Sequence, residues 1–181
     1  MPSSSQPVRS HSPSLADAPA GFFVNLPGVR LWYVDSGGDG TPVVLLHANT
    51  GTVEAWRNQI EVFAQAGYRV IAFDRRGWGR SVAQASTGDQ PSSVAEDLEA
   101  LVGHLQLPPF HLVGIAGGGF VALDYAAWRP ERLRRLVVAA SNGQFKEPDM
   151  QAFYDRMAVP GLTGNPHLRV YLEVGVSYRA E

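Results

Sequence analysis

The sequence predicts an α/β fold, in which a mostly parallel sheet of about six strands carries helices on both faces. Short apolar runs alternate with segments whose apolar residues recur at helical spacing, an order typical of β-α-β units. Some apolar runs, such as residues 43–46, are continuous, as expected for strands covered on both faces. Within residues 110–128, one such run passes through three glycines straight into a helical pattern. These observations favour a single core organised around that strand–helix corner.

The composition narrows the class of protein. A chain of 181 residues, 45% of them hydrophobic, is long enough to bury one sizeable core. Its formal net charge of −2 does not favour nucleic acid or an anionic membrane as a partner. The absence of cysteine excludes disulfides and thiolate chemistry, and no apolar run reaches the ~18 residues of a membrane span. We expect a cytoplasmic protein with no metal and no cofactor.

The first half of the predicted core begins with a hairpin of strands 22–26 and 29–34, separated by a Pro-Gly turn. The strand at 43–46 follows a glycine-rich loop. A helix is expected over residues 52–66, because apolar residues recur there at helical spacing and a glycine follows at the position that often ends helices. The next strand is expected at 68–73.

The second half of the core begins with a helix that starts near residue 93, where Ser93 and Glu96 have the spacing of a capping box. Its expected apolar face consists of Val94, Leu98, Leu101, Val102 and Leu105. The corner strand 110–115 and its helix follow, and a further strand is expected at 136–140. Beyond it, residues 149–157 and 167–178 have helical patterns, with a loop at 160–166.

Four motifs in order carry a family resemblance. Residues 114–118 read Gly-Ile-Ala-Gly-Gly, which fits the G-x-S-x-G pattern of a nucleophile elbow except that Ala116 stands at the serine position. His-Ala-Asn at 47–49 follows one strand, and Asp-Arg-Arg-Gly-Trp-Gly-Arg-Ser at 74–81 follows the next. Residues 130–136 link the corner helix to a later strand. With these motifs the chain resembles the α/β-hydrolase superfamily.

The resemblance divides the chain into three parts. Residues 1–20 are expected to be a disordered arm, because they are rich in serine, proline and alanine and lack the apolar stretch of a signal peptide. Residues 21–141 correspond to the N-terminal part of the hydrolase core. Residues 142–181 correspond to the start of a cap or lid, so the fold is expected to be incomplete at its C-terminus.

The resemblance also assigns roles. It makes Ala116 a vacant nucleophile position and implies an oxyanion hole from the backbone amides of Asn49 and Gly117. The acid and the histidine of the family's triad find no match in this sequence. The complete or ancestral form would hydrolyse a small ester, lactone or amide-type bond, and the chain as given is expected to be inactive as a serine hydrolase. A non-catalytic binding module and a non-functional gene fragment remain the alternatives, and Ala116 is either native or engineered.

Individual residues near these motifs each have two interpretations. His47 either contacts substrate or braces its loop. Asn49 either offers its side-chain amide to an anion or serves as an ordinary turn residue. Asp74 resembles a catalytic acid, although its place in the segment favours a role in pinning the following turn. Arg75, Arg76 and Arg80 either attract an anionic ligand or belong to a solvated loop.

Two kinds of partner are expected. One is a small-molecule substrate or ligand at the corner. The other is a second copy of the chain, because the strand at 136–140 would be an unpaired sheet edge preceded only by Arg134 and Arg135 as charged residues that hinder edge pairing.

Overall fold

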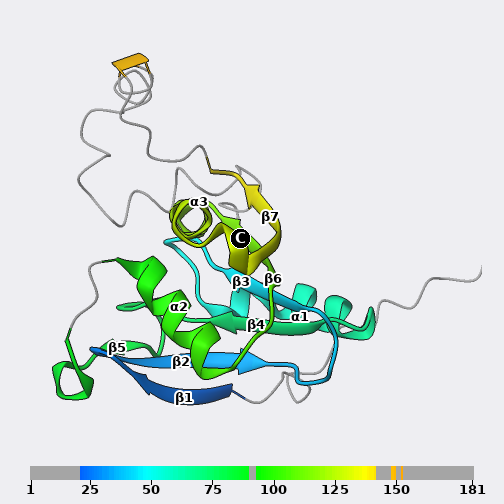
Figure 1. The fold of residues 1–181 in the computed structure, drawn as a ribbon, viewed down its shortest axis with the longest axis horizontal. Coiled ribbons are helices and arrows are strands. Elements are labelled where there is room, and N and C mark those ends of the chain that lie inside the picture. Colours follow the sequence, from blue (N-terminus) through cyan, green and yellow to red (C-terminus); the bar gives the residue numbers. More distant parts are fainter. Residues whose placement is uncertain (1–20, 90–92, 142–147, 150–151, 153–181) are drawn as a thin grey trace, which may run out of the picture.

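A computed structural model of the chain describes residues 21–89, 93–141, 148–149 and 152 (Figure 1). The predicted arm at 1–20 lies outside the described residues. So do nearly all of the predicted cap at 142–181 and its helices at 149–157 and 167–178, with the loop at 160–166.

One seven-stranded mixed sheet forms the centre of the described chain, in the order β1-β2-β4-β3-β6-β7, with β5 paired to β2. Strand β3 pairs in parallel with β4 and β6, and β6 pairs in parallel with β7, whereas every pair that includes β2 is antiparallel. The predicted α/β class is therefore confirmed, and the seventh strand is the short β5. The strands are β1 Gly21–Leu26, β2 Val29–Asp35, β3 Pro42–Leu46, β4 Arg69–Phe73, β5 Val82–Ala83, β6 Phe110–Ile115 and β7 Leu133–Ala139.

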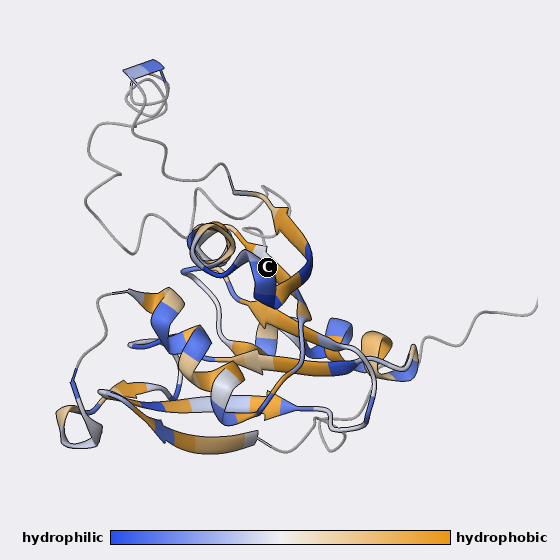
Figure 2. Cartoon of the chain, viewed as in Figure 1, coloured by the Kyte–Doolittle hydropathy of each residue, from blue (hydrophilic) through white to orange (hydrophobic). Residues whose placement is uncertain are grey.

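Helices cover both faces of the sheet, as expected. Helix α1 (Arg57–Gln65) packs on one face, and helices α2 (Val94–His104) and α3 (Gly117–Trp128) pack on the other (Figures 1 and 2). Successive residues of β3 alternate between the two cores: Val44 and Leu46 lie with α2 and α3, whereas Val43 and Leu45 lie with α1. All five β3 residues are buried, which explains why its sequence is apolar throughout.

The helix predicted over residues 52–66 differs at its start. A 3₁₀ turn, Val53–Trp56, precedes α1 because the amide of Val53 donates to the Asp74 carboxylate at 2.8 Å. Thr52 hydrogen-bonds the side chain of Glu54 rather than the backbone of the turn. Gly67 ends the helix with a φ of 87°, as its predicted role requires.

Two further details depart from the sequence prediction. The Ser93 side chain makes no capping hydrogen bond, and its carbonyl instead accepts from the Glu96 amide at 3.2 Å. The strand expected at 136–140 begins earlier, since Leu133 pairs with Phe110 across an irregularity in the register.

The predicted apolar face of α2 does face the core, since its residues Leu98, Leu101 and Val102 are fully buried.

Within the described residues, β7 pairs only with β6, and Val137 on this strand is 51% exposed. We expect the chain to self-associate through this edge, because unpaired amides and carbonyls beside apolar side chains template pairing with another strand. Size-exclusion chromatography with light scattering should show dimers or larger species. Val137→Lys should shift them toward monomer, whereas Val62→Lys, at a 59% exposed position of α1, should not. A monodisperse monomer before any substitution would contradict this expectation.

Candidate active site

The corner between β6 and α3 has a strained backbone. Ala116 has φ 46° and ψ −115°, a conformation that residues with a side chain rarely adopt and that costs about 1–3 kcal/mol. Its amide donates to the carbonyl of Ala139 at 3.0 Å, and its carbonyl accepts from the Gly119 amide at 2.9 Å. The surrounding strands and helix therefore hold the corner in this conformation.

Glycines allow the corner to press closely on its neighbours. A Cβ at Gly118 would lie 2.3 Å from the carbonyl oxygen of Leu46, and one at Gly114 would lie 2.5 Å from the carbonyl oxygen of Gly118. A Cβ at Gly117 would lie 2.0 Å from Oδ1 of Asn49. The start of α3 is thus in contact with the end of β3 and with Asn49, so two segments predicted to form one site do lie together.

His47 is fully buried and braces the loop that follows β3. Its Nδ1 donates to the carbonyl of Ala48 at 2.7 Å, and its Nε2 accepts from the amide of Arg75 at 3.0 Å, which fixes the proton on Nδ1. Burial lowers the pKa of His47, and the nearby Arg75 lowers it further. This geometry supports the bracing interpretation, and a contact with substrate stays a prediction.

Asn49 is exposed and held from two directions. Its Oδ1 accepts from Nη2 of Arg75 at 2.9 Å, and its carbonyl accepts from Nε1 of Trp78 at 2.6 Å. The guanidinium of Arg75 stacks 4.6 Å from the Trp78 ring centroid. Because a guanidinium only donates, it fixes Oδ1 toward Arg75 and leaves Nδ2 as the end of the carboxamide that can donate to a ligand.

Arg75 is the residue near the corner whose role the sequence analysis missed. It is 3% exposed, and burial lowers the pKa of its guanidinium to about 10. The segment 74–81 marked its position, but nothing in the sequence indicated that its side chain reaches Asn49. With Trp78, it holds the loop 47–49 through hydrogen bonds to His47 and Asn49.

Asp74 pins the turn that follows β4. Its Oδ1 accepts from the Val53 amide and its Oδ2 from the Arg80 amide, both at 2.8 Å, and the side chain is fully buried. Both carboxylate oxygens thus hold backbone, which supports the structural interpretation over a catalytic acid. Two of the arginines for which anion binding was one interpretation are paired within the chain: Arg76 with Asp97 at 2.6 Å, and Arg80 with Glu54 at 3.0 Å.

The low pKa of His47 predicts a pH dependence of folding. In the unfolded chain the His47 imidazole takes up a proton near pH 6.5, whereas in the folded chain it does so only at lower pH. The free energy of unfolding therefore has its full value above about pH 6.5 and decreases as the pH falls below it. For a full proton difference the slope is about 1.4 kcal/mol per pH unit. Urea melts of the native chain and of His47→Gln between pH 7.5 and 5 should show the slope largely removed by the substitution.

The matched control is His111→Gln. The pKa of His111 is also lowered, by desolvation and by Arg134 and Arg135, but this ring is far less buried than that of His47. Equal slopes in the native chain and in His47→Gln would contradict the assignment.

No group of three or more histidine, cysteine, aspartate or glutamate residues in the described part of the chain is placed to hold a metal ion. None of its helices is long and apolar enough to cross a membrane.

Comparison with known proteins identifies the class. The model of the alpha/beta hydrolase fold family matches residues 41–169, and the chain therefore belongs to this family. Over 113 residues it is 36% identical to a 2-hydroxy-6-oxononadienedioate/2-hydroxy-6-oxononatrienedioate hydrolase of Paraburkholderia phymatum. Over 116 residues it is 40% identical to a non-heme chloroperoxidase of Streptomyces lividans. These matches cover 61% and 63% of the chain but 39% and 42% of the relatives.

Solved structures agree with the fold. An esterase from Exiguobacterium antarcticum superposes with a TM-score of 0.59 at 29% identity, over 67% of this chain and 46% of the esterase. A Vigna radiata epoxide hydrolase mutant superposes with a TM-score of 0.65 over 81% of this chain and 50% of that protein. At 24% identity the second likeness supports the fold alone. The chain spans about half the length of either structure.

Proposed function

We propose that the corner at Ala116 is the ligand-binding half of a hydrolase site, from a protein whose complete form acts on a small ester, lactone or amide-type bond. The observation that carries the proposal is the strained backbone of Ala116, which is characteristic of a nucleophile elbow and is followed by Gly117 in close contact with Asn49. Ala116 then stands at the position of the nucleophile, with the amides of Asn49 and Gly117 as the oxyanion hole.

The contacts around the two amides support this assignment. Within the described residues neither the Asn49 amide nor the Gly117 amide donates a hydrogen bond, so both remain available to a ligand. The Gly117 amide begins helix α3, where the helix dipole favours negative charge. An oxyanion at this place would accept from the two amides, and Nδ2 of Asn49 is a third donor nearby.

A non-catalytic binding module is the second candidate, and the methyl side chain of Ala116 favours it. Alanine has no nucleophile and no proton to transfer, so the chain as given would bind a carbonyl or an anion without a covalent step.

Nitrophenyl acetate hydrolysis tests the proposal on the chain itself. The reference is Gly117→Val, in which the larger side chain would occupy the site. We expect the native chain to hydrolyse the ester no faster than this variant, because no group at the corner can attack the ester. A rate typical of serine hydrolases, lost in Gly117→Val, would overturn the non-nucleophilic role given to Ala116.

A further inference from the structure

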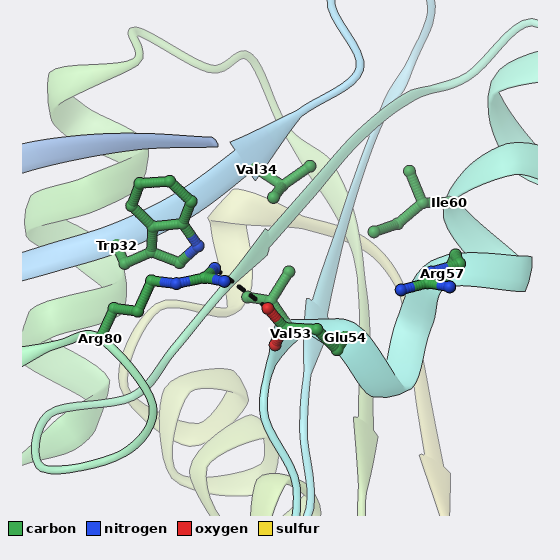
Figure 3. Close-up of a pocket in the computed structure, with 7 residues that line it drawn as sticks. All are labelled: Trp32, Val34, Val53, Glu54, Arg57, Ile60 and Arg80. Atoms are coloured by element: carbon green, nitrogen blue, oxygen red, sulfur yellow. Dashed lines mark ion pairs between the residues drawn. The ribbon is translucent and has the colours of Figure 1, made fainter. Parts of the chain in front are cut away.

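A cavity of about 300 Å³ lies away from the corner, between β2 and the start of α1 (Figure 3). It takes none of its lining from β6, from α3 or from the loop 47–49, so it is separate from the candidate active site. Its volume is at the lower end of the range for small-molecule sites. The lining residues are Trp32, Val34, Val53, Glu54, Arg57, Ile60 and Arg80.

The floor of this cavity is apolar and rigid. Val34, Val53 and Ile60 are 6%, 4% and 3% exposed and belong to the core between α1 and the sheet. The amide of Val53 is fixed by the Asp74 carboxylate, and the Trp32 amide is fixed by Oγ of Ser81 at 2.8 Å. An apolar ligand body would therefore meet a surface that is already in place.

The charges around the cavity do not cancel. Arg80 pairs with Glu54 at 3.0 Å, but both side chains are about half exposed, and such pairs contribute little to stability. Arg57 makes no ion pair with any described residue. The cavity thus has two cations and one carboxylate, which leaves one positive charge for a single anionic group.

A donor without an acceptor lies at the same place. Nε1 of Trp32 is buried and has no hydrogen-bond partner among the described residues, and it lies on the edge of the ring that faces the cavity (Figure 3). The guanidinium of Arg80 lies over this ring, 4.6 Å from its centroid. A ligand oxygen at this edge of the ring would accept from Nε1 of Trp32, and so give a partner to a buried N–H that is costly to leave unpaired.

We propose that this cavity binds a small monocarboxylate with an apolar body, such as an aromatic or short aliphatic acid. The apolar body lies on Val34, Val53 and Ile60. The carboxylate lies beside Arg80, where it accepts from Nε1 of Trp32 and competes with Glu54 for Arg80, and Arg57 adds a second positive charge from the α1 side of the cavity (Figure 3).

Ligand-observed saturation-transfer NMR tests this with benzoate, because the method works whether the chain is monomeric or associated. Benzoate should bind with a dissociation constant in the millimolar range or below, and should be displaced by hexanoate. Benzamide lacks the charge and acetate lacks the apolar body, so each should bind at least fivefold more weakly. Equal binding of benzoate and benzamide, or no benzoate binding at about 10 mM, which is roughly tenfold above a millimolar dissociation constant, would overturn the proposal.

Variants locate the site. Arg57→Gln should weaken benzoate binding at least fivefold, whereas Glu54→Gln should strengthen it because Arg80 loses its competing partner. Trp32→Phe keeps an aromatic ring, although a smaller one, but removes the N–H donor, and should also weaken binding. Arg134→Gln, on exposed β7, changes the net charge by the same amount as Arg57→Gln and should leave binding unchanged. Equal effects of Arg57→Gln and Arg134→Gln, or weaker binding in Glu54→Gln, would place benzoate elsewhere.

Discussion

Gly118→Ala is expected to destabilise the chain by ~3 kcal/mol or more, because the new methyl group would lie 2.3 Å from the carbonyl oxygen of Leu46. Backbone cannot yield as a flexible side chain does, so α3 would have to move away from β3 and take the corner with it. Whole domains are stable by only ~5–15 kcal/mol, so this loss is a large share of the total. The midpoint temperature of thermal unfolding should fall by on the order of 10 °C.

Gly103→Ala is the matched control. It is the same substitution in helix α2, at an exposed position where a Cβ would meet nothing within 4 Å. Here alanine should leave stability unchanged or raise it by up to about 1 kcal/mol, since it favours the helix. Equal melting temperatures of the two variants would contradict the close contact between α3 and the end of β3.

Ala116→Ser is expected not to create a serine hydrolase in this chain. A serine hydroxyl is a weak nucleophile without a base beside it. Among the described residues, His47 is the histidine next to the corner, and both of its ring nitrogens already bind backbone. Labelling by a fluorophosphonate probe should be roughly 10⁴-fold or more slower than for serine hydrolases, since loss of the base costs at least that much.

The control for this experiment is Ala139→Ser, an exposed serine on β7, which should label no faster than the native chain. In a longer form that supplies a histidine base, the same Ala116→Ser substitution should label readily. Rapid labelling of Ala116→Ser in the chain as given would mean that some residue outside the described part serves as the base.

The parallel core was predictable because its signals are local. The continuous apolar run of β3 required burial on both faces, and the three glycines after β6 required a tight approach of helix to strand. The family motifs also placed Asn49 and Gly117 at one site, since the carboxyl ends of neighbouring parallel strands lie at one edge of the sheet. These are properties of short segments and of strand order.

Other features depend on contacts between distant residues and leave no local pattern. The 3₁₀ turn before α1 arises because Asp74 binds the amide of Val53, and neither residue indicates this from its own segment. The contact between Arg75 and Asn49 joins residues 26 positions apart. The Ser93 side chain failed to cap α2 even though the spacing to Glu96 was right, which shows that a motif's spacing does not by itself fix a side chain's partner.

The central claim is that the amides of Asn49 and Gly117 form an anion-binding site at the corner of Ala116. The most direct test is a titration of the isotope-labelled chain with methylphosphonate, a tetrahedral anion with almost no apolar body, followed by amide ¹H–¹⁵N NMR. The account predicts that the amide protons of Asn49 and Gly117 move downfield together along one saturation curve, while the amide of Gly103 stays in place. Unchanged Asn49 and Gly117 resonances at saturating anion, or shifts confined to Trp32 and Arg57, would contradict it.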